Sequence, residues 1–167
     1  MKSHSMTDTV MYWRWASPSI IALITATAVY HWSIEGDSAP VKLFDRNAAL
    51  GANFQIINYQ ISGDGKWCLL GGISQSAGGI QGTMQLYSID KRVSQILSGH
   101  AGCFKSITPE TEGRTDQAQC LIFQEKKEGS PENKLFVLEV GRDKDAPGGV
   151  FRVQPQVCGK KKLSKLN

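Results

Sequence analysis

The residues best suited to chemistry lie together in segment 30–46, YHWSIEGDSAPVKLFDR. His31 is close in sequence to the carboxylates Glu35, Asp37 and Asp45, a combination that proteins use for proton transfer or for binding a metal ion. No second His and no Cys lies at metal-ligand spacing from His31. The segment also fits a simpler scheme, in which "YHW" belongs to a strand, "EGDSAP" forms its turn and "VKLFDR" is an outer strand. The sequence therefore favours a structural role for His31 and predicts no metal ion and no cofactor.

Other motifs that carry enzymatic chemistry fail at individual positions. The segment GDGKWC (63–68) has two glycines and a lysine, but Cys68 stands where a dinucleotide-binding loop needs Gly. A P-loop ending at the same lysine would need Gly at position 60 and Ser or Thr at position 67, but the chain has Gln60 and Trp67 there. The chain contains no GxSxG and no HExxH segment. We predict that the protein is not an enzyme, and that Asp64-Gly65 forms a hairpin turn.

Length and composition predict one globular domain. The chain has 167 residues, of which 41% are hydrophobic and 20% are charged. The net charge of +4 comes from the final stretch GKKKLSKLN, and the rest is balanced, so we expect no nucleic-acid partner. The apolar run 20–29 is too short for a bilayer, which needs about 20 residues, and is expected to be a buried strand. The four cysteines, at positions 68, 103, 120 and 158, are far apart, which favours reduced thiols in the cytoplasm.

A repeat of about 50 residues determines the predicted fold. The segments VYHWSIEG (29–36), MQLYSIDK (84–91) and LFVLEVGR (135–142) align Trp32 with Tyr87 and Phe136. Strand-rich units of roughly 40–50 residues are typical of propeller blades. We predict an all-β fold over 1–154, an incomplete β-propeller of about three four-stranded antiparallel blades at 7–47, 53–99 and 100–154. Residues 155–167 are expected to form a disordered basic C-terminal tail.

Three segments carry a resemblance to a known family. VYHWSIEGDSAPVKLFDR, QIINYQ and MQLYSIDKRVSQ resemble the N-terminal propeller of the clathrin heavy chains, and the likeness runs from about Met1 to Gly141. The resemblance implies about three blades of a seven-bladed terminal domain. It also implies that the chain is part of a structural coat protein that acts in endocytosis and vesicle-mediated transport. That protein would lie on the cytoplasmic face of coated pits and coated vesicles. Its partners would be adaptor and accessory proteins with short Leu-rich acidic motifs, and through them the membrane. Binding of clathrin light chain and trimerisation would need parts of the heavy chain that are absent here.

The resemblance also implies two peptide-binding sites. The groove between the family's fourth and fifth blades resembles a set of five residues here: Trp67, Leu86, Lys91, Val93 and Gln95. Lys91 stands where animal members usually have Arg, so the charge is kept without the planar bidentate pairing. A site on the top face resembles Gln55, Ile57 and Ile73. Without the resemblance, the residue types favour a different interpretation, in which Trp67 and Leu86 are core residues and do not line a groove.

Two competing functions follow from the same repeat. A WD-repeat scaffold is suggested by SGHAGCF (98–104) and by the strand end YSID (87–90), and failure to bind Leu-rich acidic peptides would favour it. A propeller hydrolase would require a central cluster of acidic residues or His. The terminal stretch GGVFRVQPQVCGKKKLSKLN does not resemble the family. Because an open arc of blades leaves sheet faces exposed, we expect this chain to melt below a complete ring, which a comparison of melting temperatures would test.

Overall fold

Within the described residues, which are 2–108, 118–126, 133–141 and 154–156 of a computed structural model, the chain is all-β. The first sheet contains β1 (Tyr12–Ser17), β2 (Ile20–Ile24), β3 (Ala28–Ser33) and β4 (Val41–Asp45). The second contains β5 (Gln55–Ile61), β6 (Trp67–Ser76), β7 (Gly79–Ser88) and β8 (Val93–Ser98). The third contains β9 (Ala101–Ile107), β10 (Ala118–Lys126), β11 (Asn133–Val140) and β12 (Gln154–Gln156), and a 3₁₀ turn, η1 (Ala48–Leu50), precedes the second sheet.

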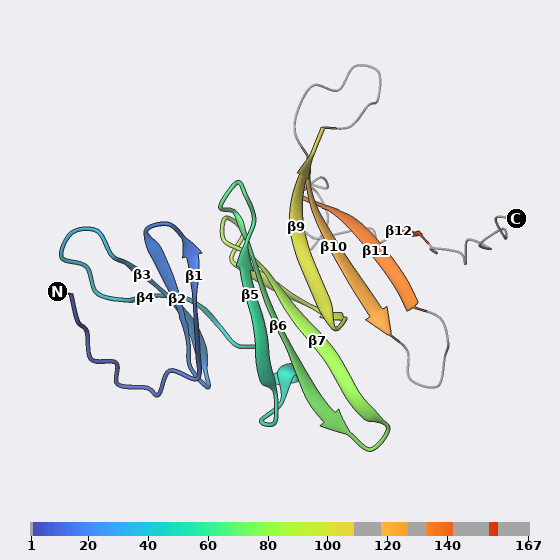
Figure 1. The fold of residues 1–167 in the computed structure, drawn as a ribbon, viewed down its shortest axis with the longest axis horizontal. Helices are drawn as coiled ribbons and strands as arrows, with labels where there is room; N and C mark the ends of the chain where they lie inside the picture. Colours follow the sequence, from blue (N-terminus) through green and yellow to red (C-terminus); the bar gives the residue numbers. More distant parts are fainter. Residues whose placement is uncertain (1, 109–117, 127–132, 142–153, 157–167) are drawn as a thin grey trace, which may run out of the picture.

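Each sheet is an antiparallel meander in which consecutive strands pair. The three sheets lie side by side in chain order, as Figure 1 shows from blue through green to orange. The predicted all-β fold of three four-stranded units, arranged as part of a β-propeller, is confirmed. β12 lies across the boundary predicted between the third unit (100–154) and the C-terminal tail (155–167), and residues 142–153 and 157–167 lie outside the described residues.

The second sheet is buried on both faces, and the residues of β6 alternate between two cores. Cys68 and Leu70 belong to the core shared with the first sheet. Trp67 and Leu69 belong to the core shared with the third sheet. A strand covered on both faces needs apolar residues at every position, which explains the continuous run WCLLGG. Each fully buried Leu side chain stabilises the fold by roughly 1.5–3 kcal/mol.

The first strands of the three sheets are joined by polar side chains. Arg14 on β1 donates through Nη1 to Oδ1 of Asn58 on β5, at 2.6 Å. The amide groups of Asn58 and Gln60 donate to the carbonyl oxygen of Gly102 on β9, at 3.4 and 3.1 Å. These contacts fix the order β1, β5, β9 along one side of the assembly.

The predicted turn at Asp64-Gly65 is confirmed between β5 and β6. Gly65 has φ 71°, a value that favours glycine because it has no side chain. Oδ1 of Asp64 accepts from the Lys66 amide at 3.1 Å and from the Ser62 hydroxyl at 2.5 Å. The Asp side chain therefore satisfies the turn's backbone locally.

Within the part of the chain that the structure describes, large apolar side chains are exposed on the face of the first sheet that is turned away from the second sheet. Met11, Trp13 and Trp15 alternate along the chain and are 55%, 61% and 50% exposed. None of the described residues forms a helix with the length and apolar character needed to cross a bilayer.

Candidate functional site

His31, the first candidate for chemistry, contacts a neighbouring sheet. Its Nε2 lies 2.7 Å from the hydroxyl oxygen of Tyr59 on β5, and the two rings meet edge to face with centroids 5.9 Å apart. Burial lowers the pKa of His31 to about 4, because the charged imidazolium loses its hydration. The neutral imidazole therefore links the first sheet to the second, which is the structural role that the sequence favours.

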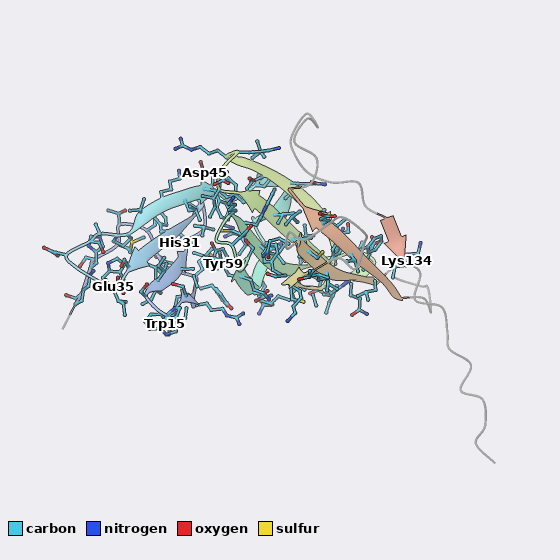
Figure 2. All side chains as sticks on the ribbon, turned by 90° about the horizontal axis from the view of Figure 1, so that it is seen from above. Trp15, His31, Glu35, Asp45, Tyr59 and Lys134 are labelled. Atoms are coloured by element: carbon cyan, nitrogen blue, oxygen red, sulfur yellow. The ribbon has the colours of Figure 1, made fainter. Side chains whose placement is uncertain are left out.

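The carboxylates near His31 in sequence do not gather around it. Figure 2 shows Glu35 and Asp45 displaced from His31 in different directions, whereas Tyr59 lies beside it. Oδ1 of Asp45 pairs instead with Nζ of Lys42 at 2.5 Å, on the surface. Across the described part of the chain, no three His, Cys, Asp or Glu side chains group as metal ligands. No observation there favours the propeller hydrolase.

Tyr59 and Cys68 continue the contact inward from His31. Burial raises the pKa of Tyr59 well above its ordinary value, and the neighbouring Cys68 raises it further. Burial also raises the pKa of the Cys68 thiol to about 12, although its hydrogen bond to Tyr59 acts in the opposite direction. A nucleophilic cysteine needs a lowered pKa, so this thiol is suited to packing.

The burial of His31 predicts that stability depends on pH. Its folded-state pKa of about 4 lies below the unfolded value of 6.5, so its contribution is complete above pH 6.5 and is lost as pH falls toward 4. We expect the free energy of unfolding to drop by roughly 1–2 kcal/mol between pH 7 and pH 5 from this residue. Urea denaturation at both pH values should show the loss, and His31→Gln should remove it. An equal pH dependence in both proteins would contradict the assignment.

Four of the five residues expected in the first peptide groove share one face of the second sheet. Leu86 on β7 lies directly opposite Gln95 on β8, while Trp67 on β6 and Val93 on β8 both lie opposite Ser88. Cross-strand partners point to the same side of a sheet. This is the face that packs against the third sheet. The remaining residue, Lys91, lies in the exposed turn between β7 and β8, and its amide lies 3.3 Å from the Ser88 hydroxyl.

Two of these side chains are core residues. Trp67 is 5% exposed and Leu86 is 1% exposed, as the alternative favoured by the sequence requires. Val93 and Gln95 are half-buried, so they and Lys91 provide the accessible surface.

The second predicted set lies at the other end of the same sheet. Gln55 on β5 is the direct partner of Ile73 on β6. Ile57 lies at a register irregularity of β5, between Ile56 and Asn58, and is 42% exposed. Because a bulge redirects a side chain, the irregularity could not be predicted from the alternation of residues. The structure thus brings Gln55, Ile57 and Ile73 into one neighbourhood, away from Lys91.

The chain is similar in sequence to known proteins of one kind. No family model matches it. A probable clathrin heavy chain 1 of Caenorhabditis elegans is 45% identical over 141 residues, which are 84% of this chain and 8% of that protein. Clathrin heavy chain 2 of Homo sapiens is 42% identical over 142 residues, 85% of this chain and 8% of that protein. The chain is a homologue of the clathrin heavy chains.

Plant relatives extend the similarity slightly further along the chain. Clathrin heavy chain 1 of Arabidopsis thaliana is 42% identical over 153 residues, 88% of this chain and 9% of that protein. The homology confirms the resemblance found in the sequence. The chain spans less than a tenth of the length of these clathrin heavy chains.

Proposed function

We propose that the chain is a structural, non-enzymatic part of a clathrin coat, and that its second sheet binds short Leu-rich acidic segments of adaptor and accessory proteins. This activity would place it on the cytoplasmic face of coated pits and coated vesicles, connected to the membrane through those adaptors. The observation that carries the proposal is the clustering of Val93 and Gln95 above the buried Trp67 and Leu86, beside the exposed Lys91.

The chemistry of this surface suits such a peptide. Apolar walls accept leucine side chains, and the Gln95 amide can hydrogen-bond an extended main chain. The ammonium group of Lys91 attracts a carboxylate without fixing its orientation, because it acts as a point charge. Since an exposed ion pair contributes about 0.2–1 kcal/mol, Lys91 should set selectivity more than total affinity.

Fluorescence anisotropy with a labelled decapeptide of three Leu and two Asp, flanked by Gly and Ser, tests the proposal. We expect the wild-type chain to bind it, and Lys91→Ala to weaken binding about three- to fivefold. Lys91→Arg should retain or improve affinity, because a guanidinium can pair with a carboxylate through two hydrogen bonds. Lys105→Ala, which removes an exposed cation of the third sheet, serves as the matched control. Equal affinity of wild type, Lys91→Ala and Gln95→Ala would refute this surface as the peptide site.

A further inference from the structure

A second groove lies on the opposite side of the second sheet, between it and the first sheet. It is an open groove of about 390 Å³ between β4 and the β7–β8 region. Phe44 and Tyr87 line it, with rings stacked 4.4 Å apart at 23°. Both residues are almost fully buried, at 5% and 7% exposed. The groove therefore has a rigid aromatic floor, of which a small part is accessible to an incoming apolar side chain.

The charges along the groove leave one guanidinium available. Lys42 lies on the β4 side, where it is engaged by Asp45, and this hydrogen bond raises the pKa of Lys42. Arg92 lies on the opposite wall, and among the described residues its side chain has no ion-pair or hydrogen-bond partner. The groove thus has a net positive charge centred on Arg92, which is complementary to a carboxylate.

The backbone at Arg92 supplies an independent observation. Arg92 has φ 56°, and it is the non-glycine residue with positive φ among those described. Side chains other than Gly, Asn and Asp rarely adopt this conformation. Strained residues of this kind are found preferentially at binding sites, where the surrounding structure holds them in place. Here the left-handed turn places a long cationic side chain at the groove.

The other wall offers backbone groups. β4 is the last strand of the first sheet, so the outer edge of Val41–Asp45 has no partner strand among the described residues. Its pairing with β3 is irregular at Leu43: Val29 pairs with Phe44 and Tyr30 pairs with Lys42, so Leu43 has no direct partner on β3. An exposed edge presents unpaired N–H and C=O groups to which an extended peptide can add as a further strand.

We propose that this groove binds an extended acidic peptide that pairs with the edge of β4, covers Phe44 and Tyr87 with an aliphatic side chain and presents a carboxylate to Arg92. Because alternate residues of a strand point to the same side, the recognised pattern is Leu-x-Asp. The site is separate from the surface that contains Gln95, whose side chain lies on the opposite face of the second sheet, so it neither requires nor replaces the function proposed above.

Anisotropy titrations of the 167-residue chain with fluorescein-Gly-Ser-Thr-Leu-Thr-Asp-Thr-Ser-amide test this site. We expect Arg92→Ala to weaken binding about tenfold, as loss of a charge-assisted hydrogen bond does. Lys105→Ala, which removes an exposed cation of the third sheet, is the control and should change affinity less than about twofold. A peptide with Asn in place of Asp lacks the carboxylate for Arg92 and should bind about tenfold more weakly. A peptide with an N-methyl group on the Thr between Leu and Asp lacks one main-chain donor and should be weakened to a similar degree.

Arg92→Gly separates binding from folding. Glycine accepts the positive φ without strain, so this variant should melt a few degrees higher than wild type while losing the peptide. If the chain self-associates, every variant is also made in a background that carries Trp13→Lys and Trp15→Lys. These two exposed residues lie on the face of the first sheet that is turned away from the second sheet. Absence of binding up to about 1 mM, or unchanged affinity in Arg92→Gly, would overturn the proposal. Unchanged affinity for the Asn peptide or for the N-methyl peptide would also overturn it. None of these outcomes would change the effect of Lys91→Ala on binding of the decapeptide, so the function proposed above is tested separately.

Discussion

Replacing Gly82 by Ala is expected to lower the free energy of unfolding by about 3 kcal/mol or more, because the site cannot accept even one methyl group. An ideal Cβ at this position would lie 2.4 Å from the carbonyl oxygen of Gly99 and 2.7 Å from the Cα of His100. Both are backbone atoms, so no side-chain rotation can relieve the clash. The Gly99 amide donates to the Gly82 carbonyl oxygen at 3.0 Å, and the next amide, of His100, donates to Gln124 at 3.0 Å. Moving residues 99–100 would therefore disturb the connection between the second and third sheets.

Gly71→Ala is the matched control for this prediction. Gly71 is also a buried strand glycine, but a Cβ there would meet its nearest atoms, on Asn58 and Met84, at 3.7 Å. That is an ordinary packing distance, so the added methyl group should fit without a clash. Because Ala also lowers the conformational entropy of the unfolded chain, this variant should be as stable as wild type or slightly more stable. Urea denaturation of both variants gives the comparison. Similar stabilities for Gly82→Ala and Gly71→Ala would show that the second and third sheets are not in close contact at Gly82.

The strands could be predicted because each depends on local pattern. The run 67–72 is apolar at almost every position, and the structure covers both of its faces. Asp64-Gly65 could be predicted because the turn's φ and its side-chain hydrogen bonds lie within five residues. In both cases the information that fixes the structure lies inside the segment.

The contacts between sheets could not be predicted in this way. Trp67 and Leu86 carry the same side chains whether they form a groove wall or a core, and only the position of the third sheet decides that they are buried. His31 meets Tyr59 across 28 positions of sequence, and nothing near either residue indicates the pairing. The groove lined by Arg92 is another feature between two sheets that the sequence does not indicate. The adjacent cations at 91–92 are the local signal there, and nothing in the sequence shows that Arg92 lines a groove between the first two sheets.

Gln85 shows how strongly one such contact can hold two sheets together. Its side chain is 0% exposed. Oε1 accepts from the Asn47 amide at 2.9 Å, and Nε2 donates to the Asp45 carbonyl oxygen at 3.0 Å and to the Ser94 hydroxyl oxygen at 2.8 Å. Because Asp45 and Asn47 lie at the end of the first sheet and Gln85 on β7, one amide group joins the two sheets. A buried amide is tolerated in a core only when it is fully hydrogen-bonded, and this one is.

We expect Gln85→Leu to lower the free energy of unfolding by about 2–4 kcal/mol, since it leaves the Asn47 amide and the Asp45 carbonyl without their partner. Ser94→Ala, which removes one of the three hydrogen bonds of Gln85 at an exposed residue, should cost only about 1 kcal/mol. Gln81→Leu on the exposed part of the same strand is the control and should change stability by less than about 0.5 kcal/mol. Chemical denaturation of the four proteins decides the matter. If Gln85→Leu matched Gln81→Leu, apolar packing alone would hold the first two sheets together, and the hydrogen bonds of Gln85 would be incidental to the fold.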